Sequence, residues 1–179
     1  MAAPVPSTFY AGQRWRAADV NAQIRDNLNW AMAAKVCRVQ RAGSQAIASG
    51  GDGDAILFTT EDFDPYGWHN NSVYPNLIVP NIAGYYQIHA SLEFVANATG
   101  HRRAIISAHS FGAGPYWMAS TSAVGHASIR PMLAVSTVVY LNGSDDYVQL
   151  IAYQDSGSNL NTSVADGLTT SLCVALIGT

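Results

Sequence analysis

Apolar and polar side chains alternate along residues 85–94, directly after Gly84. Successive side chains of a β-strand point to opposite faces, so this period of two predicts a half-buried strand. Its inner face is apolar and its outer face mostly polar, which raises the question of what lies against the outer face. The inner set is Tyr86, Ile88, Ala90, Leu92 and Phe94, and the outer set is Tyr85, Gln87, His89, Ser91 and Glu93.

From residue 36 onward, short apolar runs are separated by turns rich in glycine, asparagine and aspartate, such as SGGDGD and LNGSDD. Regularly spaced short strands without a helical period predict an all-β sandwich of the jelly-roll type. We expect one domain over residues 36–179. The predicted strands are residues 36–41, 55–60, 77–80, 85–95, 103–110, 116–119, 132–141, 147–154 and 170–177.

Two of these strands, residues 147–154 and 170–177, are apolar on both faces. In the first, Ile151 and Tyr153 lie on the face opposite Leu150, and all three are apolar or aromatic. A sandwich strand in a monomer is normally apolar on one face only. The pattern therefore predicts that the outer face of their sheet is covered, and another copy of the same sheet is the simplest cover.

The first 35 residues follow a different pattern. Residues 17–35 have apolar side chains at helical spacing, with Asp19 in the first turn, where the helix dipole favours an acid. The preceding segment is extended and marked by prolines. This arm either folds back onto its own domain or docks on a neighbouring protein, and the sequence leaves both open. The residues we expect to dock are Phe9, Tyr10, Trp15, Ile24 and Leu28.

Charge is scarce and unevenly distributed. Only 12% of the residues are charged, and the net charge is −3. Residues 1–41 nevertheless carry six basic and two acidic side chains, so the basic charge lies near the N-terminus. These basic residues form no dense run of the kind that attracts nucleic acid, so we expect no nucleic-acid partner. No apolar run reaches the length of a membrane span and no secretory signal is present, which predicts cytosolic synthesis without membrane insertion.

Enzymatic chemistry has little support in the sequence. Ser107, Ser110, His109 and His126 could supply a nucleophile and a base, but no G-x-S-x-G turn is present. The acidic pairs in GGDGDA and GSDD lack the ligand count of a calcium loop, so solvent-exposed turn residues are the simpler interpretation. We expect no enzyme activity and no cofactor or metal.

One strand resembles a known family. GYYQIHA is similar to the G-x-Y-x-F-x-F/Y signature of C1q and tumour-necrosis-factor-like jelly rolls, with Gly84 and Tyr86 in register. It departs from the signature at Ile88 and Ala90, where the family usually has aromatic residues. The late hairpin STVVYLNGSDDYVQLIAYQDSG and the closing strand TSLCVALIG also resemble the family, and the similarity covers residues 36–179.

That resemblance implies a homotrimer. One sheet, holding residues 36–41, 85–95, 147–154 and 170–177, would face the threefold axis. It also implies that the first and last strands pair, which would make Cys37 and Cys173 near neighbours. We expect both as free thiols, because a cytosolically made protein seldom holds a disulfide. The implied interface residues are Tyr85, Gln87, His89, Ile151, Tyr153, Ala175 and Ile177.

A second resemblance concerns the N-terminal segment. FYAGQRWRAADVNAQIRDNLNW is similar to the segment G-x-x-x-x-A-A-x-x-N-x-x-x-R-D-N-L-N that opens many bacteriophage tail, fibre and appendage proteins. It implies a virion component that residues 1–35 attach to capsid or tail proteins, as a capsid decoration or a minor tail protein. The matching residues are Gly12, Ala17, Ala18, Asn21, Arg25, Asp26, Asn27, Leu28 and Asn29.

Host attachment is the alternative function. Two predicted loops, DPYGWHNNSVY and GAGPYWM, are rich in aromatic residues, which stack well on sugar rings when they are exposed. Aromatic residues in loops can equally well close the ends of a sandwich. The residues that would bind a host cell-surface glycan are Tyr66, Trp68, His69, Tyr116 and Trp117.

Overall fold

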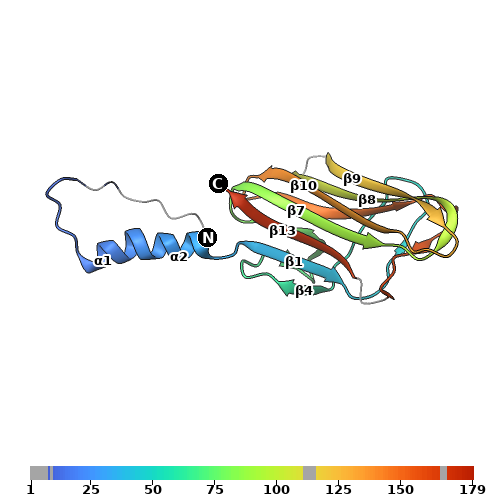
Figure 1. Cartoon of the computed structure of the whole chain (residues 1–179), viewed down its shortest axis with the longest axis horizontal. Coiled ribbons are helices and arrows are strands. Elements are labelled where there is room, and N and C mark those ends of the chain that lie inside the picture. Colours follow the sequence, from blue (N-terminus) through green and yellow to red (C-terminus); the bar gives the residue numbers. More distant parts are fainter. Residues whose placement is uncertain (1–7, 9, 111–115, 166–168) are drawn as a thin grey trace. The chain divides into compact units, whose positions relative to one another are not determined.

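The computed structural model describes residue 8 and residues 10–110, 116–165 and 169–179. The chain divides into two compact units, residues 1–35 and residues 36–179. The second unit is built mainly from two packed antiparallel β-sheets, with a further two-stranded pair (Figure 1).

The N-terminal unit holds one continuous helical segment. It comprises α1 (Ala17–Val20), a π-helical turn (Asn21–Arg25) and α2 (Asp26–Met32). The helix is three residues shorter than predicted, since Ala33 is extended and Lys35 Nζ donates to the carbonyl oxygens of Trp30 and Ala33. These bonds satisfy carbonyl groups that a helix end leaves without partners. No helix of the described residues is long and apolar enough to cross a membrane.

The first sheet has the strand order β10-β7-β13-β1-β4, and every pair in it is antiparallel. It includes both the first and the last strand of the sandwich, which lie side by side, as the family resemblance implied. Its strands are β1 (Val36–Arg41), β4 (Thr60–Phe63), β7 (Gly84–Glu93), β10 (Met132–Leu141) and β13 (Thr170–Gly178).

The second sheet has the order β5-β6-β11-β8-β9, and a short strand, β3, pairs with β11 beside β6. A separate two-stranded pair joins β2 (Ala46–Ile47) to β12 (Leu160–Asn161). The strands of the second sheet are β3 (Asp54–Ala55), β5 (His69–Asn70), β6 (Tyr74–Ile78), β8 (Asn97–Ser110), β9 (Tyr116–His126) and β11 (Asp146–Gln154).

The alternation predicted for β7 is confirmed. All five side chains of its apolar set have no exposed surface, because they face the second sheet across the core. Tyr85, Gln87 and His89 are exposed on the opposite face. Glu93 differs from the other polar residues, since it is buried and its Oε1 lies 3.6 Å from Arg130 Nε.

The predicted sheet membership of residues 147–154 is wrong. The corresponding strand, β11, pairs with β8 in the second sheet and not with β7 or β13. Ile151 and Tyr153 therefore lie on the other side of the sandwich from Tyr85. The second apolar face of β11 has a local cause, because Ile151 is covered by the chain around Gly53 and Ala55.

The two cysteines lie on paired strands, as predicted. In the β1–β13 ladder Cys37 is opposite Val174, and Arg38 is opposite Cys173, so the cysteines are one position out of register. Adjacent ladder positions point to opposite faces. Cys37 is fully buried in the core and Cys173 is half-buried on the open face, so their side chains point apart and both are free thiols.

Candidate functional site

The open face of the first sheet, meaning the face directed away from the core, exposes several large apolar and aromatic side chains among uncharged polar ones. Tyr85, Val138, Tyr140 and Ile177 are each more than half exposed. Along β10, β13 and residues 85–91 of β7, the open-face positions include no Asp, Glu, Lys or Arg. These positions are Tyr85, Gln87, His89, Ser91, Met132, Ala134, Ser136, Val138, Tyr140, Ser171, Cys173, Ala175 and Ile177.

Cross-strand contacts organise this face. Tyr85 and Tyr140 are opposite each other in the β7–β10 ladder, and their rings pack edge to face with centroids 5.4 Å apart. Charged side chains of the described residues lie at two edges of this face. Toward β4, Arg38 Nη1 lies 3.0 Å from Asp62 Oδ2, and at the end of β7 the buried Glu93 pairs with Arg130. The central part of the face is therefore uncharged, with an ion pair at each of these two edges.

Five of the seven predicted interface residues share this face: Tyr85, Gln87, His89, Ala175 and Ile177. Sequence reasoning missed Val138 and Tyr140, although β10 alternates as clearly as β7. The alternation of exposed and buried positions in MLAVSTVVYL could have identified the two faces of β10. It does not show which sheet the strand joins.

The open face of the second sheet is hollowed by a pocket of about 390 Å³. Its floor and walls come from β9, β11 and the 52–55 segment. Trp117, a predicted glycan residue, is half exposed here. The lining residues are Asp52, Gly53, Ala55, Trp117, Gln149 and Ile151.

The aromatic residues predicted to bind a glycan fall into two groups. Trp68 and His69 are buried, so neither ring is available for stacking on a sugar. Trp68 donates from Nε1 to Asn81 Oδ1 at 2.9 Å and packs edge to face on Tyr86, with centroids 5.5 Å apart. Tyr66 is partly exposed and lies tilted against Trp68. This group closes one region of the core, which was the alternative interpretation of these loops.

The backbone N–H and both ring nitrogens of His69 have polar partners. Its backbone N–H donates to Asp64 Oδ2 at 2.8 Å, Nδ1 lies 3.0 Å from Glu61 Oε1, and Nε2 lies 3.2 Å from the Pro75 carbonyl oxygen. These contacts join β5 to the neighbouring segments. They give His69 a structural role and leave Tyr116 and Trp117 as the exposed members of the predicted set, of which Trp117 lines the pocket and Tyr116 does not.

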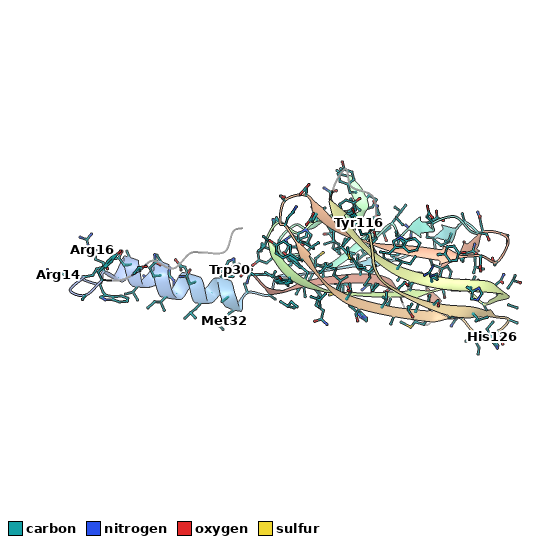
Figure 2. All side chains as sticks on the ribbon, turned by 90° about the horizontal axis from the view of Figure 1, so that it is seen from above. Arg14, Arg16, Trp30, Met32, Tyr116 and His126 are labelled. Atoms are coloured by element: carbon teal, nitrogen blue, oxygen red, sulfur yellow. The ribbon has the colours of Figure 1, made fainter. Side chains whose placement is uncertain are left out.

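The N-terminal unit exposes most of its large apolar side chains. Tyr10, Trp15, Ile24 and Leu28, four of the predicted attachment residues, are all exposed, and so is Met32 at the helix end. Figure 2 shows the labelled side chains of this unit, which include Arg14, Arg16, Trp30 and Met32. Phe9, the fifth predicted attachment residue, lies outside the described residues.

The residues considered for catalysis do not form a site in the described part of the chain. Ser107 is fully buried on β8, and its hydroxyl has no hydrogen-bond partner there. His126, at the far end of β9 from Tyr116 (Figure 2), accepts backbone hydrogen bonds from Ser128 and Ile129 through Nδ1. The side chains of His109 and Ser110 lie outside the described set.

The acidic turns are also explained by local hydrogen bonds. Asp145 Oδ1 accepts from Asn142 Nδ2 and Ser144 Oγ, and these bonds lower the pKa of the Asp145 carboxyl. Asp54 Oδ2 accepts the backbone N–H of Ala48 at 2.7 Å. Among the described residues, no group of three or more His, Cys, Asp or Glu side chains could hold a metal ion.

Comparison with known proteins gives a clear result for the fold. Murine APRIL at pH 5.0 superimposes with a TM-score of 0.62 at 10% identity, covering 81% of this chain and 100% of APRIL. Eiger TNF from S. frugiperda gives 0.61 at 5% identity, over 81% and 93% of the two chains. The globular domain of zebrafish complement 1qA gives 0.59 at 11% identity, over 81% and 98%. The fold is a C1q/TNF-like jelly roll.

Sequence comparison alone does not detect this likeness. No protein-family profile matches the chain, and no curated protein matches it. At identities of 5–11%, the similarity to the three structures concerns the fold of the jelly roll alone, because one fold supports many functions.

Proposed function

We propose that this protein is a noncatalytic structural component of a bacteriophage virion, made in the host cytoplasm and assembled as a homotrimer. In this proposal the open face of the first sheet is buried around the threefold axis. Residues 1–35 attach the trimer to a capsid or tail protein. The observation that carries the proposal is the exposed, nearly uncharged open face of the first sheet.

The composition of that face supports burial between subunits. Contiguous apolar surface is uncommon on monomeric proteins and usually marks an interaction site. Interfaces are depleted of charge at their centre and enriched in tyrosine, as this face is at Tyr85 and Tyr140. The polar groups of Gln87 and His89 would be satisfied by hydrogen bonds to neighbouring subunits. The trimeric state rests on the resemblance to C1q/TNF-like domains.

The N-terminal unit supports the attachment role. Its helix has an apolar stripe through Ile24 and Leu28 that its own unit leaves exposed. An amphipathic helix of this length gains most of its stability by packing its apolar face on another surface. The virion assignment rests on the resemblance of residues 9–29 to the opening segments of phage appendage proteins.

Two measurements test this function. Sedimentation equilibrium of the full chain is expected to give the mass of a trimer, and a stable monomer would contradict the assembly. Deleting residues 1–35 is expected to leave a folded trimer that no longer joins the particle. Normal incorporation of the truncated chain would place the attachment surface on the jelly roll instead.

A further inference from the structure

The pocket on the second sheet has a wall that is fixed by backbone contacts. Gly53 has φ +87°, and a Cβ at this position would lie 2.7 Å from the Ala152 carbonyl oxygen and 2.9 Å from Ile151 Cγ2. The segment therefore lies against β11 as closely as a backbone can. Nearby, Gly50 donates its N–H to the Gln154 carbonyl oxygen at 2.8 Å. These contacts hold the wall in place without a ligand.

The opposite wall is an aromatic ring held by its neighbours. Trp117 lies on β9, and the Arg103 guanidinium lies 5.5 Å from its ring centroid. Between the walls, Gln149 is positioned by Asn76, whose Nδ2 donates to Gln149 Oε1 at 3.3 Å. The pocket thus combines an exposed indole, an oriented amide and the apolar side chain of Ile151.

The charges around the pocket limit what it can hold. Asp52 lines it and, among the described residues, its carboxylate has no hydrogen-bond or ion-pair partner. Arg103 brings a positive charge to the Trp117 side. Each of these charges attracts one sign of ligand charge and repels the other, so together they give the pocket no net preference for an anion or a cation. An uncharged ligand with both apolar and hydroxyl surfaces matches the indole, Ile151 and the Asp52 carboxylate without needing a counter-charge.

We propose that this pocket binds a neutral sugar unit of a surface polysaccharide. The C–H face of the sugar packs on the indole of Trp117 and beside Ile151. Its hydroxyl groups donate to the Asp52 carboxylate and to Gln149 Oε1, an amide oxygen that can accept a second hydrogen bond beside the one from Asn76. The pocket volume lies within the usual range for small-molecule sites.

The site goes beyond the proposed structural role and does not depend on it. The pocket opens on the second sheet, whereas the proposed subunit interface uses the open face of the first sheet. Trimer formation through the first sheet would therefore leave all three pockets accessible. A decorated particle would present them as a multivalent array, in which weak individual binding adds up to strong attachment.

The test uses the full chain and saturation-transfer difference NMR. The probes are the methyl glycosides of glucose, galactose, mannose, rhamnose and N-acetylglucosamine, with glucuronic acid and glucosamine as charged comparisons. Trp117→Ala is the main variant, and Tyr116→Ala is the matched control, because Tyr116 is the exposed neighbouring aromatic and does not line the pocket. Asp52→Asn removes the charge while keeping the shape of the wall.

We expect at least one neutral glycoside to bind, and Trp117→Ala to weaken it about fivefold or more, because the stacking contact is lost. Asp52→Asn should weaken the same sugar, and Tyr116→Ala should leave its affinity unchanged. Binding of no neutral glycoside, or equal losses in Trp117→Ala and Tyr116→Ala, would overturn the proposal. Stronger binding of a charged sugar would overturn the assignment to neutral ligands.

Discussion

The two open faces of the sandwich are built from strands with the same alternation, yet they differ in what covers them. On the first sheet, Tyr85, Val138 and Tyr140 are exposed within the jelly-roll unit that the structure describes. On the second sheet, the chain around Gly53 covers Ile151, which is only 8% exposed. An apolar outer face can thus be covered by another subunit or by a loop of its own chain. Cover by another subunit favours assembly, whereas cover by a loop of the same chain leaves a pocket.

The largest expected effect is on subunit assembly. It is tested by placing a charged side chain on the open face of the first sheet and then, as a control, on that of the second sheet. Val138→Asp puts a carboxylate in the middle of the proposed interface, where burying an unpaired charge costs about 3–5 kcal/mol. We expect the trimer to dissociate into folded monomers. Sedimentation velocity measures the change, and circular dichroism checks that the sandwich remains folded.

Val124→Asp is the matched control for that experiment. Val124 and Val138 are both exposed valines, at 69% and 53%, on edge strands of the two sheets. Val124 faces solvent on the second sheet, opposite His101 in the β8–β9 ladder. The control should remain trimeric. If Val124→Asp also dissociates the trimer, the interface includes the second sheet, and the comparison between the faces fails.

A smaller effect is expected from the glycines that shape the pocket wall. Gly51 and Gly53 both have positive φ, but only at Gly53 would a Cβ meet other atoms within 4 Å. Gly51→Ala should cost about 1 kcal/mol of folding free energy, from backbone strain alone. Gly53→Ala adds a steric clash with β11 and should cost about 2–4 kcal/mol. Urea denaturation measures both, and equal losses would mean that the wall is not held by this close contact.

The smallest expected effect is on the rates at which the two native thiols react, because these rates report how deeply each thiol is buried. Burial raises the pKa of the Cys173 thiol, and the nearby Arg38 guanidinium opposes that rise. Cys173 lies half-buried on the open face of the first sheet, whereas burial in the core and nearby carboxylates raise the pKa of Cys37 much further. Iodoacetamide should therefore modify Cys173 in Val138→Asp monomers but only slowly in the trimer, and Cys37 in neither. Equal Cys173 rates in both would contradict its burial between subunits.

The parts of the fold that depend on local pattern could be predicted from the sequence. The faces of β7 follow from strict alternation, and the pairing of β1 with β13 was implied by the family resemblance. The sheet that β11 joins could not be predicted from its apolar residues. Any neighbouring segment that covers Ile151 explains why both faces of β11 are apolar. Strand partners are set by the whole chain, and two-sided apolarity does not identify them.

The residues of the candidate glycan pocket could likewise be predicted from the sequence only in part. Trp68 and Trp117 both follow loop-forming glycines in the sequence, and nothing local distinguishes them. Trp68 is buried because Tyr86 and Asn81 meet it from distant positions, whereas Trp117 faces outward beside Arg103. Asp52 and Gln149 were missed as pocket residues, because only the fold brings the 52–55 segment to β11.

The antiparallel pairing of β1 with β13 has a practical consequence for engineering. Val36 lies opposite Ala175, so the chain enters the sandwich at the same end at which it finishes (Figure 1). A peptide fused after Thr179 would emerge beside the junction with residues 1–35. The turn at residues 127–131, next to the paired Met132 and Glu93, is at the other end. If the proposed attachment through residues 1–35 holds, a foreign epitope would therefore lie farther from the attached unit in that turn than in a fusion after Thr179.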